Sequence, residues 1–192
     1  MSPLASLLLL PLLAVFQAEP ASELAAGLER KLRSIVQGAA PPAEPVRISE
    51  AELNAYIEQA REELGLPPGV TEVAITFKPG GLLARARIEL ARLEGVPESM
   101  AGIVEGARLL AGSGVPVEVE GRFRASSGFG KLDLERVSVA SMSVPIERVV
   151  ELVASSTRSR RYPHGFDLRT PFRLPHAIER VELRSGAALL SF

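Results

Sequence analysis

The chain contains no cysteine and no tryptophan, and its 192 residues include only two tyrosines. The absence of cysteine excludes disulfide bonds and metal sites with thiolate ligands. Lysine and arginine together number 22, and aspartate and glutamate 23, so the formal net charge is −1. Proteins that bind nucleic acids through bulk charge or base stacking need a basic surface or exposed aromatic rings. We therefore predict no nucleic-acid partner.

An apolar run, Leu4–Val15, lies close to the start of the chain and contains one proline. It is short for a membrane span, but it has the length of the apolar part of a signal peptide. Ala18 is a small residue at a suitable cleavage point. Residues 1–18 are therefore predicted to be a signal peptide, and the protein is expected in the periplasm or on the extracytoplasmic face of the membrane. A short buried or interfacial helix and an uncleaved anchor are the alternatives.

Two helices are expected after this run. Leu24, Leu28 and Leu32 recur at helical spacing within residues 22–36, and a Pro-rich spacer follows. Ser49 and Glu52 then form a capping box, in which each side chain accepts a hydrogen bond from the backbone amide of the other residue. The helix that begins there is expected to extend to about residue 63. We assign residues 19–47 to an N-terminal helix and spacer, and 48–192 to a single domain.

Alternating apolar and charged residues predict amphipathic strands in the rest of the chain. Three hairpins are expected, at residues 72–90, 115–139 and 178–192, and the second should turn at Ser126–Gly130. The alternation slips at Glu135–Arg136, where a β-bulge would fit. A helix after Pro145 and a connecting segment at 95–114 complete the pattern. The expected fold is α+β, a curved antiparallel sheet of about six strands with helices packed on its apolar face.

No motif in the chain specifies a reaction, because the nucleophile elbow and the glycine-rich phosphate loops are absent. His164 and His176 are the only histidines, and Asp167 is the only acidic residue close in sequence to His164. Their spacing is not that of metal ligands. We predict a protein that is not an enzyme and has no cofactor or metal. A hydrolase that uses His164, Asp167 and His176 is the alternative.

The apolar faces of the strands carry small and branched side chains. A helix that closes over a curved sheet can leave a long apolar groove along such a face. The ligand-binding residues predicted on this basis are Ala84, Ala86, Ile88, Val117, Val119 and Phe123. Periodicity alone does not separate such a groove from a filled core.

Arginines are frequent in the last fifth of the chain, and aromatic residues lie among them. A guanidinium group suits phosphate or carboxylate, and cations beside aromatic rings suit an anionic membrane surface. The predicted headgroup or membrane contacts are Arg158, Arg160, Arg161, Arg169 and Arg173. A solvated charged face is the alternative.

The segment Ser49–Ile57, with the sequence SEAELNAYI, resembles the helix start that opens the domain of several small bacterial envelope proteins. These are the YceB-like lipoproteins, the YpmS-like proteins and the LmeA-like phospholipid-binding proteins. The helix after Pro145, the segment Phe172–Pro175 and the closing hairpin are also similar. The resemblance implies a tubular or half-tubular lipid-binding fold, and it supplies no catalytic residue. The lipobox cysteine is missing here, so the lipid anchor does not carry over.

Three functions are consistent with these features. The first is an exported, non-enzymatic protein that binds a phospholipid, an acyl chain or another long apolar ligand and contacts an anionic membrane surface. The second is an envelope scaffold or assembly partner without a ligand. The third is the hydrolase described above. Lipid that co-purifies with the protein would separate the first function from the other two.

Overall fold

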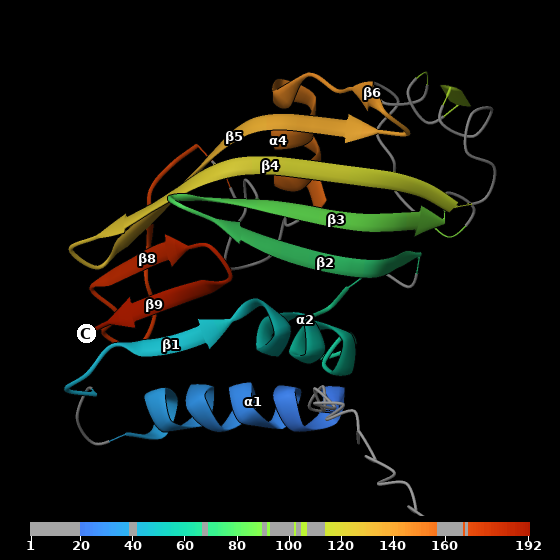
Figure 1. Ribbon diagram of the computed structural model, residues 1–192. Helices are drawn as coiled ribbons and strands as arrows, with labels where there is room; N and C mark the ends of the chain where they lie inside the picture. Colours follow the sequence, from blue (N-terminus) through green and yellow to red (C-terminus); the bar gives the residue numbers. More distant parts are fainter. Residues whose placement is uncertain are drawn as a thin grey trace, which may run out of the picture.

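The structure, a computed structural model, contains three helices and one antiparallel sheet of nine strands within the described residues (Figure 1). The described residues are 20–38, 42–66, 69–89, 92, 102, 105–106, 114–156, 167 and 169–192. The helices are α1 (Ala21–Gln37), α2 (Glu50–Gln59) and α4 (Ile146–Ser156). The strands are β1 (Val46–Ser49), β2 (Val70–Lys78), β3 (Gly81–Glu89), β4 (Gly114–Ser126), β5 (Phe129–Val139), β6 (Met142–Ser143), β7 (Phe172–Arg173), β8 (Arg180–Arg184) and β9 (Ala187–Ser191). The predicted α+β class with an antiparallel sheet is confirmed.

The sheet has more strands than the sequence predicted, nine rather than about six. The additional strands β1, β6 and β7 have four, two and two residues. Such segments are too short to show an alternating pattern, so only their pairing partners define them as strands. The predicted signal peptide lies outside the described residues. Of the predicted connecting segment at 95–114, only residues 102, 105, 106 and 114 are described.

The second hairpin turns over fewer residues than predicted. Ser127 and Gly128 alone connect β4 to β5, and both have positive φ, 53° and 76°. Two positive φ values in a two-residue loop are typical of a type I′ turn, which matches the twist of the flanking strands. Phe129 and Gly130 were predicted in the turn but belong to β5. The predicted bulge is confirmed, because Glu135 is skipped where the register of β4 and β5 shifts.

β4 connects the two halves of the sheet. Its first part pairs with β3, from Gly114 to Arg122, and its last part meets β8 at Ala125. β8 pairs with β9, and β9 pairs with β1. The strand order is therefore β1-β9-β8-β4-β3-β2, with β5 on the other edge of β4 (Figure 1). β1 and β2 are the two ends of this order.

Helix α2 lies between these two end strands. It begins directly after β1, at the capping box that the sequence predicted. The Glu52 amide donates to Ser49 Oγ at 3.2 Å, and the Ser49 amide donates to Glu52 Oε2 at 2.9 Å. These bonds satisfy backbone amides that a helix start leaves without partners.

Side chains of α2 also satisfy the outer edge of β2. Asn54 Nδ2 donates to the Ile75 carbonyl at 2.9 Å, and the Ile75 amide donates to Asn54 Oδ1 at 2.7 Å. The Phe77 amide donates to Glu50 Oε1 at 2.5 Å. Arg61, just beyond α2, donates to the Val70 carbonyl. An exposed strand edge is a template for pairing with other chains, so this helix protects the sheet without adding a strand.

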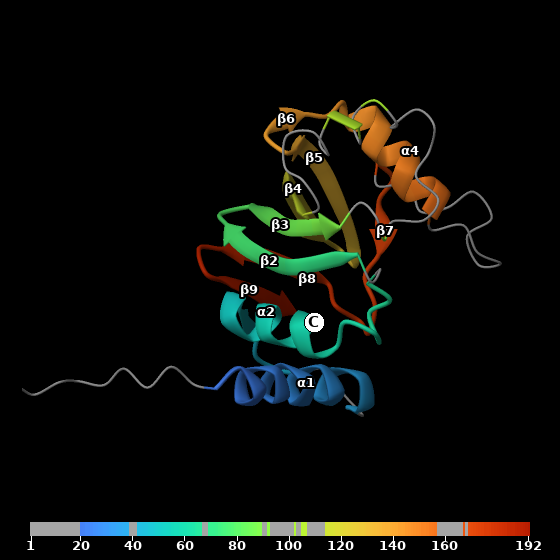
Figure 2. The ribbon, with the colours of Figure 1, turned by 90° about the vertical axis from the view of Figure 1, so that its right-hand side faces the viewer.

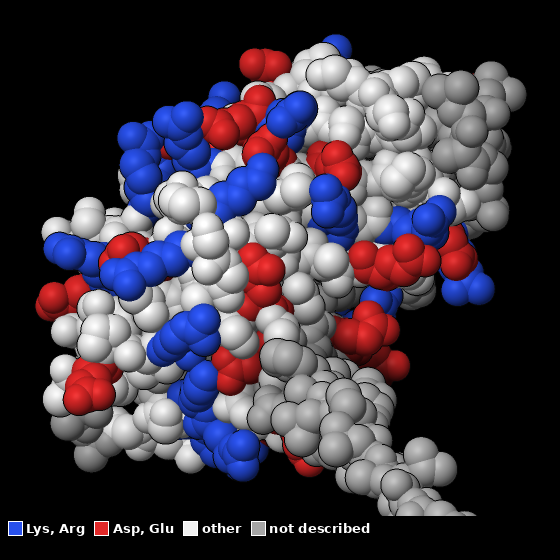
Figure 3. All heavy atoms as spheres, viewed as in Figure 1, with Lys and Arg blue, Asp and Glu red and all other residues white. Residues whose placement is uncertain are grey.

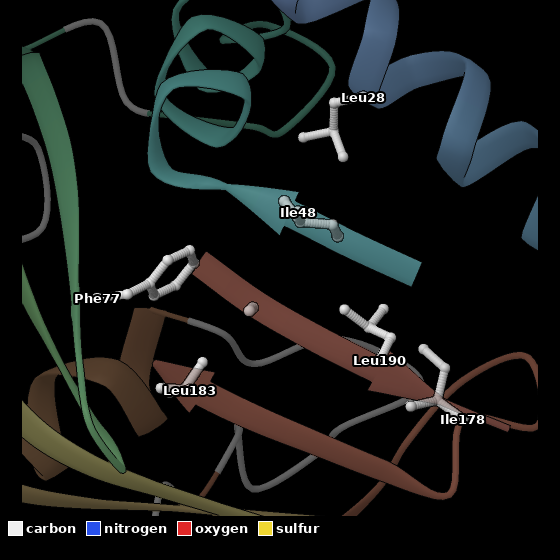
Figure 4. Close-up of a cluster of buried hydrophobic side chains, with 7 residues drawn as sticks. Leu28, Ile48, Phe77, Ile178, Leu183 and Leu190 are labelled. Carbon is white, nitrogen blue, oxygen red and sulfur yellow. The ribbon is translucent and has the colours of Figure 1, made fainter. Parts of the chain in front are cut away.

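The main core lies where α1, β1, β2, β8 and β9 meet. Leu28 of α1 lies with Ile48 of β1, Phe77 of β2 and residues of the final hairpin (Figure 4). Leu28 is 1% exposed. A second, smaller cluster consists of Val137 of β5 and Val144, against which Val149 of α4 packs. Figure 2 shows α4 beside one face of the sheet and α1 with α2 at the β1–β2 end. No helix in the described part of the chain is long and apolar enough to cross a bilayer.

Candidate functional site

One face of strands β2–β5 is apolar. Because side chains alternate along a strand, the register brings residues of one face into rows across the sheet. Three such rows are Ile75–Ala84–Val119–Val137, Ala86–Val117–Val139 and Val70–Ile88–Val115. Five of the six predicted groove residues, all except Phe123, therefore lie side by side in these rows.

Within the three rows, the smallest side chains lie on β3. Ala84 and Ala86 each present a single methyl group, while their neighbours across the strands are Ile or Val. Both alanines remain half-buried, as do Val117 and Val119. On the β5 side, α4 covers the face through Val149, which packs against Val137 and Val144. The apolar face is therefore covered by α4 at β5, whereas along β3 its two alanine side chains are short and half-buried.

Phe123, the sixth predicted groove residue, lies at the other end of the same face. Its ring centroid is 6.3 Å from that of Phe172 in β7. Phe172 and Leu174 lie over Gly130, where a Cβ atom would meet side-chain atoms of both at 3.0 Å. This end of the face is filled by the chain itself.

The predicted headgroup contacts are only partly described. Arg158, Arg160 and Arg161 lie outside the described residues. Arg169 is held by Asp167, which accepts from its backbone amide at 2.9 Å and from its Nε at 3.1 Å. Arg173 is exposed on β7, where it is the register partner of Phe129.

The residues of the hydrolase alternative do not form a described cluster. His164 lies outside the described residues, and the Asp167 carboxylate forms an ion pair with Arg169. His176 is exposed at a turn with a φ of 52°. Within the described ranges, no group of three or more His, Asp or Glu side chains is placed to hold a metal ion.

The opposite face of β2–β5 is covered by ion pairs. Glu118 pairs with Arg85 at 2.7 Å, and Glu120 pairs with both Lys78 and Arg136. Hydrogen bonds from Lys78 and Arg136 lower the pKa of Glu120 to about 2. On one face of the sheet, therefore, charged side chains pair with each other. On the other face, no charged side chain of the described residues is buried.

This pKa predicts the direction of a pH effect. The folded-state pKa of Glu120 lies below its ordinary value of 4.5, so its ionised form stabilises the fold above that value. The contribution should be lost as the pH falls from about 4.5 to about 2. Chemical denaturation of the wild type and Glu120→Gln between pH 2 and 6 should give stabilities that converge at the acid end. Glu147→Gln, on α4 outside this network, should keep the wild-type pH dependence, and parallel curves for Glu120→Gln would contradict the prediction.

Four shallow hollows are lined by described residues, and none of these four includes the predicted groove residues. The largest, about 720 Å³, lies at the β4–β5 turn and the loop that leads to β8, beside Arg173 and Leu174. One of about 560 Å³ lies between α1 and Glu52 of α2. The other two, about 240 and 370 Å³, lie on the charged face around Glu118 and Arg136.

Two residues that shape the surface were not predicted from the sequence. Asn54 was expected only as part of a helix, although an amide side chain in a helix interior among better helix formers is a signal of a specific hydrogen bond. Phe129 was placed in a turn. Recognition of Ser127-Gly128 as a two-residue turn would have placed it in a strand, on the charged face.

Fold and site together define an α+β protein whose antiparallel sheet has one apolar and one charged face. No family model matches the chain, and no curated protein or solved structure matches it. The resemblance to the small envelope proteins therefore stays a prediction.

Proposed function

We propose that the protein is an exported, non-enzymatic component of the cell envelope that binds a lipid or another long apolar ligand along strands β3 and β4. The observation that carries this proposal is the half-buried position of Ala84 and Ala86 between larger side chains, on the face of the sheet that α4 covers only at β5. An acyl chain that lies on these methyl groups would remove their apolar surface from water. Each buried methylene contributes about 0.8 kcal/mol.

The chemistry of the two faces supports this side of the sheet as the ligand side. The apolar rows contain only aliphatic side chains, whereas the other face is lined with ion pairs that would each have to be desolvated. The apolar leader predicted at residues 1–18 and the resemblance to lipid-binding envelope proteins agree with the proposal. The ligand-free scaffold is the alternative that the experiment below would favour if the proposal failed.

Ala86→Phe tests the proposal. If this face is a ligand-binding groove, the added ring should abolish lipid uptake. It should lower the free energy of unfolding by less than the roughly 1–3 kcal/mol that is typical of overpacking a filled core. Mass spectrometry of an organic extract measures the bound lipid, and denaturant unfolding measures the cost. Ala74→Phe is the matched control, because Ala74 is the register partner of Arg85 and so belongs to the charged face.

Two results would overturn the proposal. The first is an extract of the wild-type protein that contains no lipid after purification from its native host. The second is a loss of stability in Ala86→Phe of the size expected for a filled core, with lipid content unchanged. Lipid in the wild type and in Ala74→Phe, but not in Ala86→Phe, would support it.

A further inference from the structure

An aromatic ring is exposed at the end of the charged face. Phe129, the first residue of β5, is 54% exposed. It is the register partner of Ser126 on β4 and of Arg173 on β7. Gly130, the next residue along, pairs with Ala125 and Phe172 on the apolar face. Phe129 therefore projects from the opposite, charged face, where no apolar core surrounds it.

Four cations surround this ring on the same face. Arg173 lies directly beside Phe129, and Lys131 lies two residues further along β5. Arg124 is the register partner of Lys131. Because Val181 pairs with Ala125, Arg180 lies next to Ser126 on the other side of the turn. We call Phe129 with these four cations the basic tip.

The acids near the basic tip leave part of its charge uncompensated. Asp133 pairs with both Arg124 and Lys131. Glu182 pairs with Arg184 and also attracts Arg180 electrostatically. Glu179 lies at the turn beside the tip. Within the described part of the chain, Arg173 and Arg180 make no ion pair. Figure 3 shows Lys and Arg side chains over this end of the sheet, where β4, β5 and β8 meet.

We propose that the basic tip is the surface by which the protein contacts an anionic lipid membrane. Phe129 enters the interfacial layer, and the guanidinium groups of Arg173 and Arg180 contact lipid phosphates. Aromatic rings are favoured at the membrane–water interface, and each Lys or Arg near an anionic leaflet adds to the attraction. Among the described residues, Phe129 is the one aromatic ring that is exposed, and the net charge of the chain is −1. Such a surface suits a bilayer better than a nucleic acid, which requires a larger cationic surface.

This contact is independent of the ligand proposed for the apolar face. The basic tip belongs to the charged face and to the β4–β5 turn, whereas the proposed ligand lies on the other face of β3 and β4. Membrane binding and lipid content are therefore measured separately, and either can fail without the other.

The absence of tryptophan from the chain provides a local probe. Phe129→Trp places a single indole at the tip, and Val36→Trp places one on α1, at a site that is 55% exposed. Both variants are made in the full chain, so any effect of the N-terminal apolar run is common to them. On addition of vesicles rich in phosphatidylglycerol, the indole emission of Phe129→Trp should shift to shorter wavelength, and brominated lipid should quench it. Val36→Trp should show neither change.

A charge comparison tests the cations. Arg173→Ser with Arg180→Ser should weaken co-sedimentation with the same vesicles by about 30-fold at low salt, because each cation near an anionic surface is worth about fivefold. Arg85→Ser with Arg87→Ser removes the same charge from the far end of the same face and should weaken binding much less. High salt and phosphatidylcholine vesicles should reduce the difference between the two pairs.

Several results would overturn the proposal. Equal losses in the two arginine pairs would show that binding follows net charge alone. An emission spectrum of Phe129→Trp that vesicles leave unchanged would show that the tip does not enter the interface. Tip-dependent binding to an oligonucleotide or heparin without a spectral change on vesicles would assign the surface to a soluble polyanion.

Discussion

Replacement of Asn54 by Leu is expected to lower the free energy of unfolding by about 2–6 kcal/mol, although Leu is the better helix former. The Asn54 side chain donates to the carbonyl of Ile75 and accepts from its amide, at 2.9 and 2.7 Å. Leu has nearly the same size but offers neither group. Two partly buried backbone groups of β2 would then lack partners, at about 1–3 kcal/mol each. Chemical denaturation followed by circular dichroism measures the loss.

The control for this prediction is Gln59→Leu, which replaces an exposed amide on the same helix. It should change stability by no more than about 0.5 kcal/mol. Asn54→Leu should also self-associate in sedimentation experiments, because its uncovered β2 edge can pair with another chain. A wild-type unfolding midpoint in Asn54→Leu would show that α2 does not hold this edge.

Truncation of Leu28 to Ala is expected to cost about 2–5 kcal/mol and to loosen α1 from the rest of the molecule. Leu28 is among the most completely buried side chains of the described residues and lies in the cluster that contains Ile48 and Phe77 (Figure 4). Lys31 also attaches α1 through polar contacts. Its ammonium group forms an ion pair with Glu52 at 2.6 Å and donates a hydrogen bond to the Arg47 carbonyl at 2.8 Å. The cavity left at Leu28 therefore weakens the main contact of this helix.

Hydrogen exchange should locate the effect of this truncation. In Leu28→Ala, amides of α1 should exchange faster than those of β4 and β5. Val36→Ala removes methyl groups from an exposed position on the same helix and should leave stability within about 0.5 kcal/mol of the wild type. Similar small losses in both variants would mean that α1 contributes little to the core.

The features predicted correctly from the sequence are mostly local. The capping box joins residues three apart, and its two hydrogen bonds depend on little beyond Ser49 and Glu52. The bulge at Glu135 appears as a slip in the alternation along one strand. The same alternation placed Ala84, Ala86, Val117 and Val119 on one face, and the register confirms that these residues are neighbours.

The features that were missed depend on partners far along the chain. β7 is a strand only because Phe172 and Arg173 reach the edge of β5, more than 40 residues earlier in the sequence. Asn54 and Ile75 are 21 residues apart, and no periodicity relates them. The position of Phe129 among cations depends on the turn type and also on where β7 and β8 lie.

Local patterns were enough to predict where most helices and the longer strands lie and which side of each strand is apolar, because helix caps, turns and periodicity depend on residues close together in the chain. Contacts between distant segments set the strand order, the position of α2 between β1 and β2, and the cover that α4 gives to β5. They also leave small residues of β3 half-buried and place Phe129 among cations. These outcomes depend on pairing and packing between distant segments, whose free energies no local pattern contains.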